Sequence, residues 1–302
     1  MHLWCSWVAV QMRQVFLFII AATLVACSDE RVDVEPGTGP LVVAVLPDQS
    51  KDRLVSRHSL LLDYLRQATA RDFELVIPRD YADLLDEFDS GRIDLAWFGG
   101  LTYIQAVERS NAVPLTFRDV DIEFTSCYLA PAMDTRTTLG EFENVDFSFG
   151  PRLSTSGHLM PRYFLEEEGV YAEQFFGSVR HSDGHDQTAN WVRDGTVALG
   201  VANCNIVQYL FDNRLLSKDE VKILKTTPPY SDYVWAVLPT MDQSTKSLLL
   251  DAFLSLDATD FGHRAILRAQ GANAYLPAGR GNFDLVRTAA RRAGLVAKET
   301  EN

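Results

Sequence analysis

A group of hydroxyl side chains at a predicted strand-to-helix turn is the part of this sequence best suited to binding chemistry. Ser154, Thr155 and Ser156 precede Gly157 and follow a strand-like run at 145–149. Hydroxyl donors and free backbone N–H groups would surround one point there, and the dipole of the following helix favours negative charge at that point. The turn therefore predicts a cradle for an oxyanion, although taken alone it also fits an ordinary Ser/Thr helix N-cap.

Parallel β-sheets bind ligands beyond the carboxyl ends of their strands, so residues that follow predicted strands are candidates for the same site. Apolar runs at 41–46, 73–77 and 93–98 alternate with helical patterns at 54–65 and 81–88, which is typical of βαβ units. Taken alone, the histidine and the tyrosines among the candidates also fit core or turn positions. The residues at strand exits that we expect to converge with the serine-rich turn on one cleft are Asp48, Gln49, Phe98, Gly99, Thr102, Tyr103, His185, Asn203, Tyr230 and Asp232.

A faint internal similarity predicts two lobes of like construction. Residues 85–95 and 190–199 both run from a helix through a glycine into a strand, and Gly91 and Gly195 suit a left-handed helix C-cap. The helical C-terminal part has to dock on the first lobe, so the chain crosses between the lobes twice and the ligand lies in the cleft between them. We expect crossings near 120–126 and 232–237, lobe 1 at 41–123 plus 235–302, and lobe 2 at 124–234.

A hydrolase is the alternative that the same residues raise, because Ser154, His185 and Asp186 could be proposed as a catalytic triad. The G-x-S-x-G elbow is absent, and an aspartate adjacent to the histidine cannot easily present its carboxylate to the ring nitrogen. The sequence also lacks a P-loop, a dinucleotide-binding glycine pattern and an HExxH motif. We therefore expect a binding protein rather than an enzyme, with no cofactor and no metal.

The composition excludes several classes of partner. The chain has 302 residues, of which 47% are hydrophobic, enough for a full core and better divided between two lobes than kept in one. Its net charge of −13 argues against nucleic acid or an anionic membrane surface as the partner. An anion would therefore have to be held by local dipoles and hydrogen bonds, which the serine-rich turn provides.

The N-terminus is predicted to be a lipoprotein signal peptide. Met12-Arg13 gives a short positive start, 15–22 is an apolar segment too short to span a bilayer, and 24–27 (Leu-Val-Ala-Cys) resembles a bacterial lipobox. Met12 is a candidate start codon, because no lysine or arginine precedes it. A plain signal peptide with a chance cysteine is the alternative. We expect a signal peptide at 1–26, a lipid anchor at Cys27 that holds a periplasmic protein to a membrane, and a flexible tether at 27–40.

Two cysteines lie within the body of the chain, Cys127 and Cys204. Export to an oxidising compartment allows a disulfide, but each could equally be a small buried apolar residue. Neither has the spacing of a metal site. The sequence leaves both interpretations open.

Several segments resemble the phosphonate/phosphite family of ABC-transporter substrate-binding proteins. The similarity is carried by 94–103 and 154–161, while 184–186, 199–203 and 227–233 are more similar still to a branch of that family named for selenate binding. The resemblance extends over roughly residues 41–296.

This resemblance implies a type 2 periplasmic-binding-protein fold, with two doubly wound α/β lobes joined by two hinge strands. Such a protein closes on a small oxyanion and hands it to an ABC permease in the membrane, and we expect a monomer. By the same resemblance, residues 154–156 and His185 would grip the anion, whereas Asn203, Tyr230 and Asp232 would shape the rest of the pocket. The alternative function is a sensor lipoprotein that presents the anion to a membrane kinase.

One position departs from the family's pattern. The family usually carries a small hydroxyl residue three places before Ser154, where this chain has Pro151 followed by Arg152. Proline offers neither a hydroxyl nor an N–H group, so one ligand contact is missing or Arg152 replaces it with a charge-assisted pair. Asp48 or Asp232 could accept the proton of a phosphorus oxyanion, whereas selenate and sulfate carry only acceptor oxygens. The sequence therefore favours phosphonate, phosphite or phosphate over selenate.

Overall fold

The computed structural model describes residues 39–297 of the chain. The predicted signal peptide, Cys27 and all but the last two residues of the predicted tether lie outside this described part. Within residues 39–297, no helix is both long enough and apolar enough to span a membrane.

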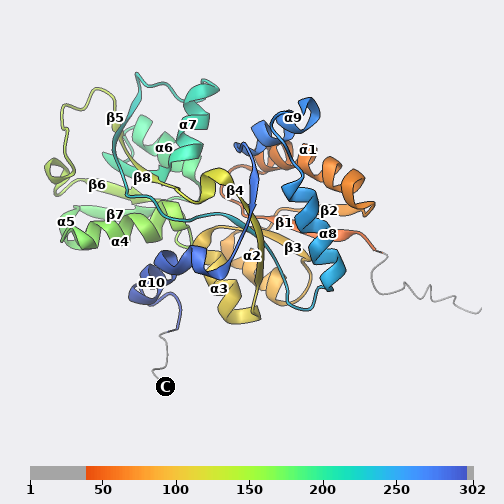
Figure 1. The fold of residues 1–302 in the computed structure, drawn as a ribbon. Coiled ribbons are helices and arrows are strands. Elements are labelled where there is room, and N and C mark those ends of the chain that lie inside the picture. Colours follow the sequence, from red (N-terminus) through yellow and green to blue (C-terminus); the bar gives the residue numbers. More distant parts are fainter. Residues whose placement is uncertain (1–38, 298–302) are drawn as a thin grey trace, which may run out of the picture. The chain divides into compact units, whose positions relative to one another are not determined.

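The first β-sheet has six strands: β1 (Leu41–Val45), β2 (Phe73–Val76), β3 (Leu95–Phe98), β4 (Val113–Arg118), β10 (Val234–Val237) and β11 (Tyr275–Pro277). Their order is β11-β4-β10-β3-β1-β2, with β1, β2 and β3 parallel and β10 antiparallel between β3 and β4. The late helices α8 and α9 return to this sheet beside α1 (Figure 1). We call this sheet and its helices lobe 1. The helices are α1 (Lys51–Thr69), α2 (Tyr81–Asp89), α3 (Gly100–Ser110), α8 (Gln243–Leu254), α9 (Phe261–Gln270) and α10 (Asp284–Arg292).

The second β-sheet has five strands: β5 (Ser126–Pro131), β6 (Asp146–Phe149), β7 (Ser178–His181), β8 (Leu199–Asn203) and β9 (Val221–Thr226). Their order is β7-β6-β8-β5-β9, with β6 parallel to β7 and β8, and β5 antiparallel to β8 and β9. The helices of this part, called lobe 2, are α4 (Met160–Glu167), α5 (Ala172–Phe175), α6 (His185–Arg193) and α7 (Cys204–Asp212). The remaining short turns are η1 (Asp119–Asp121), η2 (Leu139–Phe142), the π-helical η3 (Thr155–Leu159) and η4 (Arg280–Phe283).

The two lobes are built alike, as the sequence predicted. The strand order β2-β1-β3 of lobe 1 recurs as β7-β6-β8 in lobe 2. Gly91 and Gly195, which follow α2 and α6, have φ angles of 78° and 71°. These left-handed conformations confirm the predicted C-caps, because an L side chain would be strained there.

The chain passes between the two sheets twice. It leaves the first sheet after β4 and enters the second at β5, and it returns between β9 and β10. The two connecting segments touch, because Phe124 and Tyr230 form an antiparallel bridge. The segment that leads into β10 therefore lies beside the segment that leads into β5, at the junction of the two lobes.

A disulfide joins Cys127 on β5 to Cys204, the first residue of α7. The sequence alone leaves this bond open. Cys127 follows Ser126 and Cys204 follows Asn203, so the bond ties together the strand ends that carry these two polar residues. The structure thus links the disulfide directly to the region of the predicted cleft.

Candidate functional site

The serine-rich turn lies between β6 and α4, where the sequence placed it, and begins the π-helical turn η3. Ser154 is the N-cap, and its Oγ accepts a hydrogen bond from the N–H of Gly157 at 2.9 Å. The N–H of Gly150 donates to the carbonyl of Gly157 at 2.7 Å and closes the loop. Because the Ser154 hydroxyl already accepts a hydrogen bond, its own proton is left for another group.

His185 stands beside this turn as the first residue of α6. Its Nδ1 accepts the backbone N–H of Asn203 at 3.2 Å, so Nε2 carries the ring proton, and Nε2 lies 3.4 Å from the Ser154 Oγ. Burial lowers the pKa of His185 to about 3. Burial disfavours the charged ring, so His185 is neutral near neutral pH. The neutral imidazole can still donate through Nε2.

Two site residues cover the N-terminus of helix α3. The Oδ1 atom of Asp232 accepts the N–H of Gly100 at 2.8 Å, and the Oγ1 atom of Thr155 accepts the N–H of Leu101 at 2.9 Å. Thr155 belongs to lobe 2 and α3 to lobe 1, so the serine-rich turn is bound to both lobes. The positive end of α3 is already occupied by a carboxylate of the protein itself.

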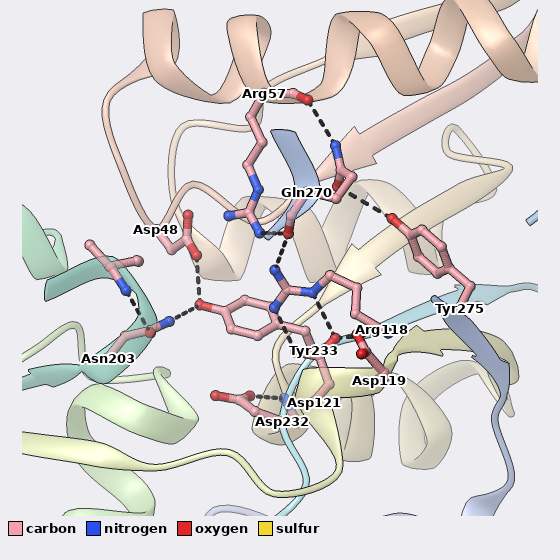
Figure 2. Close-up of polar contacts among 12 residues, drawn as sticks. Asp48, Arg57, Arg118, Asp119, Asp121, Asn203, Asp232, Tyr233, Gln270 and Tyr275 are labelled. Carbon is pink, nitrogen blue, oxygen red and sulfur yellow. Dashed lines mark hydrogen bonds and ion pairs between the residues drawn. The ribbon is translucent and has the colours of Figure 1, made fainter. Parts of the chain in front are cut away.

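A row of three side chains joins the lobes on the other side of the site (Figure 2). The Nδ2 of Asn203, at the end of β8, donates to the Tyr233 hydroxyl at 2.9 Å. That hydroxyl donates to the Oδ2 of Asp48, which follows β1, at 2.6 Å. The backbone N–H of His185 also donates to the carbonyl of Asp48, at 3.4 Å. Asn203, Tyr233 and Asp48 are all buried.

Four buried polar atoms in this region have no hydrogen-bond partner among the described residues. They are the Oδ1 of Asp48, the Oδ2 of Asp232, the Oγ of Ser156 and the hydroxyl of Tyr81. Leaving such a group unpaired costs about 1–3 kcal/mol, and native proteins carry few of them. Four of them together indicate a place where a polar ligand supplies the missing partners.

Electrostatic interactions link the Tyr81 phenol to Asp48, Asp232 and Ser154, so these groups lie near one another. Burial raises the pKa of the Tyr81 phenol well above its ordinary value. The negative charges of Asp48 and Asp232 raise it further, while the Ser154 hydroxyl lowers it. Tyr81 is the first residue of α2 and therefore contributes a donor from lobe 1 that faces the serine-rich turn of lobe 2.

The two carboxylates have shifted pKa values for a common reason. Burial raises the pKa of Asp232 to about 7, although the N–H of Gly100 lowers it. Burial also raises the pKa of Asp48, while the Arg57 guanidinium and the hydrogen bond from Tyr233 lower it. Near neutral pH, Asp232 can therefore act either as a proton acceptor or as a proton donor.

Several predicted site residues are engaged elsewhere. Phe98 packs edge-on against Phe88 in lobe 1, and Tyr103 packs against Phe283 with ring centroids 4.8 Å apart. The Thr102 hydroxyl donates to the carbonyl of Gly99 at 3.0 Å. Gln49 is partly buried and lines a neighbouring cavity. Tyr230, by contrast, lies at the candidate site: its hydroxyl is 2.6 Å from the Ser126 Oγ, and burial and the charge of Asp232 raise the pKa of its phenol.

Two alternatives from the sequence are decided by side-chain positions. The Arg152 side chain is exposed, whereas the residues of the site are buried, so it does not stand in for the hydroxyl that Pro151 lacks. The Asp186 carboxylate faces Arg53 at 3.9 Å, and the His185 Nδ1 is used by a backbone N–H instead of a carboxylate. A catalytic triad is therefore absent at this histidine. Within the described residues, no group of three or more His, Cys, Asp or Glu side chains could hold a metal ion.

Comparison with known proteins identifies the family to which the chain belongs. Residues 43–281 match the family described as "ABC transporter, phosphonate, periplasmic substrate-binding protein". The chain belongs to this family. Its members are solute-binding proteins of transporters and not enzymes, which agrees with the expectation from the sequence, and they act outside the cytoplasm.

Individual members of the phosphonate-binding family show how far the similarity extends. A "Probable ABC transporter phosphite binding protein PhnD1" of Prochlorococcus marinus is 29% identical over 79% of this chain and 84% of its own length. A "Phosphate-import protein PhnD" of Mycolicibacterium smegmatis is 26% identical over 60% of this chain and 59% of its own length. The structure of P. marinus PhnD1 in complex with methylphosphonate covers 86% of this chain and 100% of that chain, with a TM-score of 0.80 and 25% identity.

Tyr81 and Ser126 lie in this candidate region but were not selected from the sequence, whereas Tyr233 lies in the segment 227–233 that carries the family resemblance. For Tyr81 a signal was present. The spacing that relates Gly91 to Gly195 also relates Tyr81 to His185, so the internal similarity places both at the start of equivalent helices.

Proposed function

We propose that this protein captures a small phosphorus oxyanion, namely a phosphonate, phosphite or phosphate, between its two lobes and delivers it to an ABC permease. Family membership supports the transport role, and the names of its relatives include phosphite, phosphate and methylphosphonate. The single observation that carries the choice of ligand is the set of four unpartnered buried atoms.

These atoms require a ligand that both accepts and donates hydrogen bonds. Tyr81 and Ser156 offer donors, whereas Asp48 and Asp232 offer acceptor oxygens. Selenate and sulfate carry no proton near neutral pH, but a phosphorus oxyanion can. A carboxylate left facing another acceptor would cost about 1–3 kcal/mol, which corresponds to roughly tenfold to hundredfold selectivity for the protonated ligand.

A thermal-shift panel with phosphate, phosphite, methylphosphonate, sulfate and selenate tests this proposal on the wild type and on Ser156→Ala and Tyr81→Phe. We expect each substitution to weaken binding of the phosphorus ligand by about tenfold to hundredfold, because the ligand loses a donor. The melting temperature without ligand should change little, because neither hydroxyl has a close hydrogen-bond partner among the described residues. Isothermal titration gives the dissociation constants.

Tyr103→Phe is the matched control. Its hydroxyl is equally buried and unpartnered among the described residues, but the ring packs against Phe283 in lobe 1. This variant should keep wild-type affinity. Equal losses at Tyr81 and Tyr103, or no loss at either Tyr81 or Ser156, would show that the ligand binds elsewhere.

The pKa of Asp232 predicts a pH-dependent choice between anions. Below pH 7 the Asp232 carboxyl is protonated and can donate to a sulfate oxygen; above pH 7 it is charged and repels sulfate. We expect sulfate affinity to fall by about tenfold between pH 6 and 8, whereas a phosphorus ligand that brings its own proton should lose less. Titration calorimetry at several pH values measures both. In Asp232→Asn the pH dependence for sulfate should disappear, and a flat wild-type profile would contradict the assignment.

We further propose that the protein has the predicted signal peptide at 1–26 and tether at 27–40, is anchored through a lipid on Cys27, and acts as a monomer whose lobes close on the ligand. The alternative function is that of a sensor lipoprotein, which presents the same ligand to a membrane kinase instead of a permease. Neighbouring permease and ATPase genes would support import, whereas a neighbouring sensor-kinase gene would support signalling.

A further inference from the structure

A cavity of about 370 Å³ lies against the row formed by Asn203, Tyr233 and Asp48. Asn203 and Tyr233 line it, and so does Gln49, the residue after Asp48. Its walls come from α1 and from residues 268–271 of lobe 1 and from α7 of lobe 2. The cavity is therefore next to the proposed ligand site and is bounded by both lobes.

Arginines dominate the charge of this cavity. Four of the lining residues are arginines, whereas Asp52 is the one acidic residue among them; the arginines are Arg53, Arg57, Arg118 and Arg268. The chain as a whole carries a net charge of −13, so this concentration of positive charge runs against the rest of the protein.

Neighbouring carboxylates neutralise only part of this charge. Arg118 forms a close bidentate ion pair with Asp121, which largely neutralises its positive charge. Arg53 forms a long ion pair with Asp186, at 3.9 Å across the lobes, and its guanidinium lies over the Tyr209 ring, while its Nη1 lacks a hydrogen-bond partner among the described residues. Arg268 is exposed.

The innermost arginine stands behind the proposed ligand site. The Nη2 of Arg57 donates to the carbonyl of Gln270 at 3.1 Å, and the Nη1 of Arg118 donates to the same carbonyl at 2.7 Å (Figure 2). The Arg57 Nε has no hydrogen-bond partner among the described residues, and its charge lowers the pKa of Asp48. Positive charge thus extends from the exposed Arg268 to the wall of the site.

We propose that this arginine cavity is an entry site that first attracts the incoming oxyanion and raises its association rate before the anion moves into the site. The inference rests on the proposed function. A protein of strongly negative net charge repels an anion at long range. A cleft lined by positive groups between low-dielectric walls focuses the electric field, so the anion is attracted there. Such steering acts on the association rate more than on the stability of the final complex.

Stopped-flow fluorescence with inorganic phosphite as the probe tests the proposal, after an equilibrium titration of the wild type. At low ionic strength we expect Arg268→Gln to lower the association rate constant by about two- to fourfold, with the dissociation rate constant unchanged. Arg53→Gln combined with Arg268→Gln should lower it further. The differences should shrink at 1 M salt, where the Debye length is about 3 Å.

Lys246→Gln is the matched control, because it removes the same charge from a residue of α8 that does not line the cavity. It should associate at the wild-type rate. An unchanged rate for Arg268→Gln, or an equal slowing by Lys246→Gln, would overturn the entry site while leaving the proposed function intact. Absence of phosphite binding by the wild type would instead overturn the proposed function, and the entry site with it.

Discussion

Removal of the disulfide by Cys127→Ala together with Cys204→Ala should lower the free energy of unfolding by about 2–5 kcal/mol and the melting temperature by roughly 5–15 °C. The bonded cysteines are 77 residues apart, so the bond closes a long loop of lobe 2 and restricts the unfolded chain. That loop contains β6, the serine-rich turn, His185 and β8. Thermal unfolding followed by circular dichroism measures the change.

The disulfide should also affect ligand binding, because it pins Ser126 and Asn203 at its two ends. Asn203 positions the His185 ring and the Tyr233 hydroxyl through separate hydrogen bonds. A reducing agent should therefore weaken phosphorus-oxyanion binding by the wild type but have no further effect on the double alanine variant. If reduction leaves the wild type's melting temperature unchanged, the bond does not contribute to stability as argued.

The sequence predicted the first half of lobe 1 well because its strands are continuous apolar runs. β1 and β3 are buried on both faces, and each is followed by a helix with a clear apolar stripe. β10 has the same apolar character, yet it runs antiparallel between β3 and β4. Strand direction here depends on where the chain returns after lobe 2, and the local pattern holds no information about that return.

Strands of lobe 2 were harder to predict because several are not apolar runs. β9 lies at the edge of its sheet, carries two lysines and is buried mainly at Val221. Edge strands commonly carry such charges, which resist further strand pairing. A pattern search for buried strands therefore passes over β9, and over β7 at the opposite edge.

For the site, the sequence predicted positions better than side-chain directions. Asp48, Asn203 and Asp232 were selected as residues near strand ends, and the structure brings their side chains into one region. Thr102 and Tyr103 were selected for the same reason, but as residues of α3 they point into lobe 1. A strand exit places the Cα atom, whereas the helix that follows decides which side chains face the cleft.

The arginines of the neighbouring cavity show a second limit of prediction from the sequence. Arg53 and Arg57 are one helical turn apart on α1, so they share a face, but this pattern is equally typical of a solvated helix. Arg118 ends β4 and reaches the same place from a different element. Their significance depends on tertiary contacts that join α1, β4 and α9.

Gly157→Ala should have the largest effect on the site, with phosphorus-oxyanion binding weakened by more than about a hundredfold. An added Cβ would lie 2.9 Å from the Cε1 of His185, 3.0 Å from the Cα of Gly150 and 3.1 Å from the Oγ of Ser154. These atoms belong to the ring, the loop and the hydroxyl that shape the cradle, and the Gly150 Cα cannot move without moving the backbone. Overpacking of this kind costs about 1–3 kcal/mol, so the melting temperature should fall by several degrees as well.

Gly140→Ala separates this effect from the general cost of replacing glycine, because nothing lies within 4 Å of the Cβ that it would add. That variant should keep both its melting temperature and its affinity. Binding is measured by calorimetry well below either melting temperature, so that unfolding does not contribute to the loss. Wild-type affinity in Gly157→Ala would mean that the ligand does not use the serine-rich turn, since the turn cannot accept the extra methyl group without displacing Ser154 or His185.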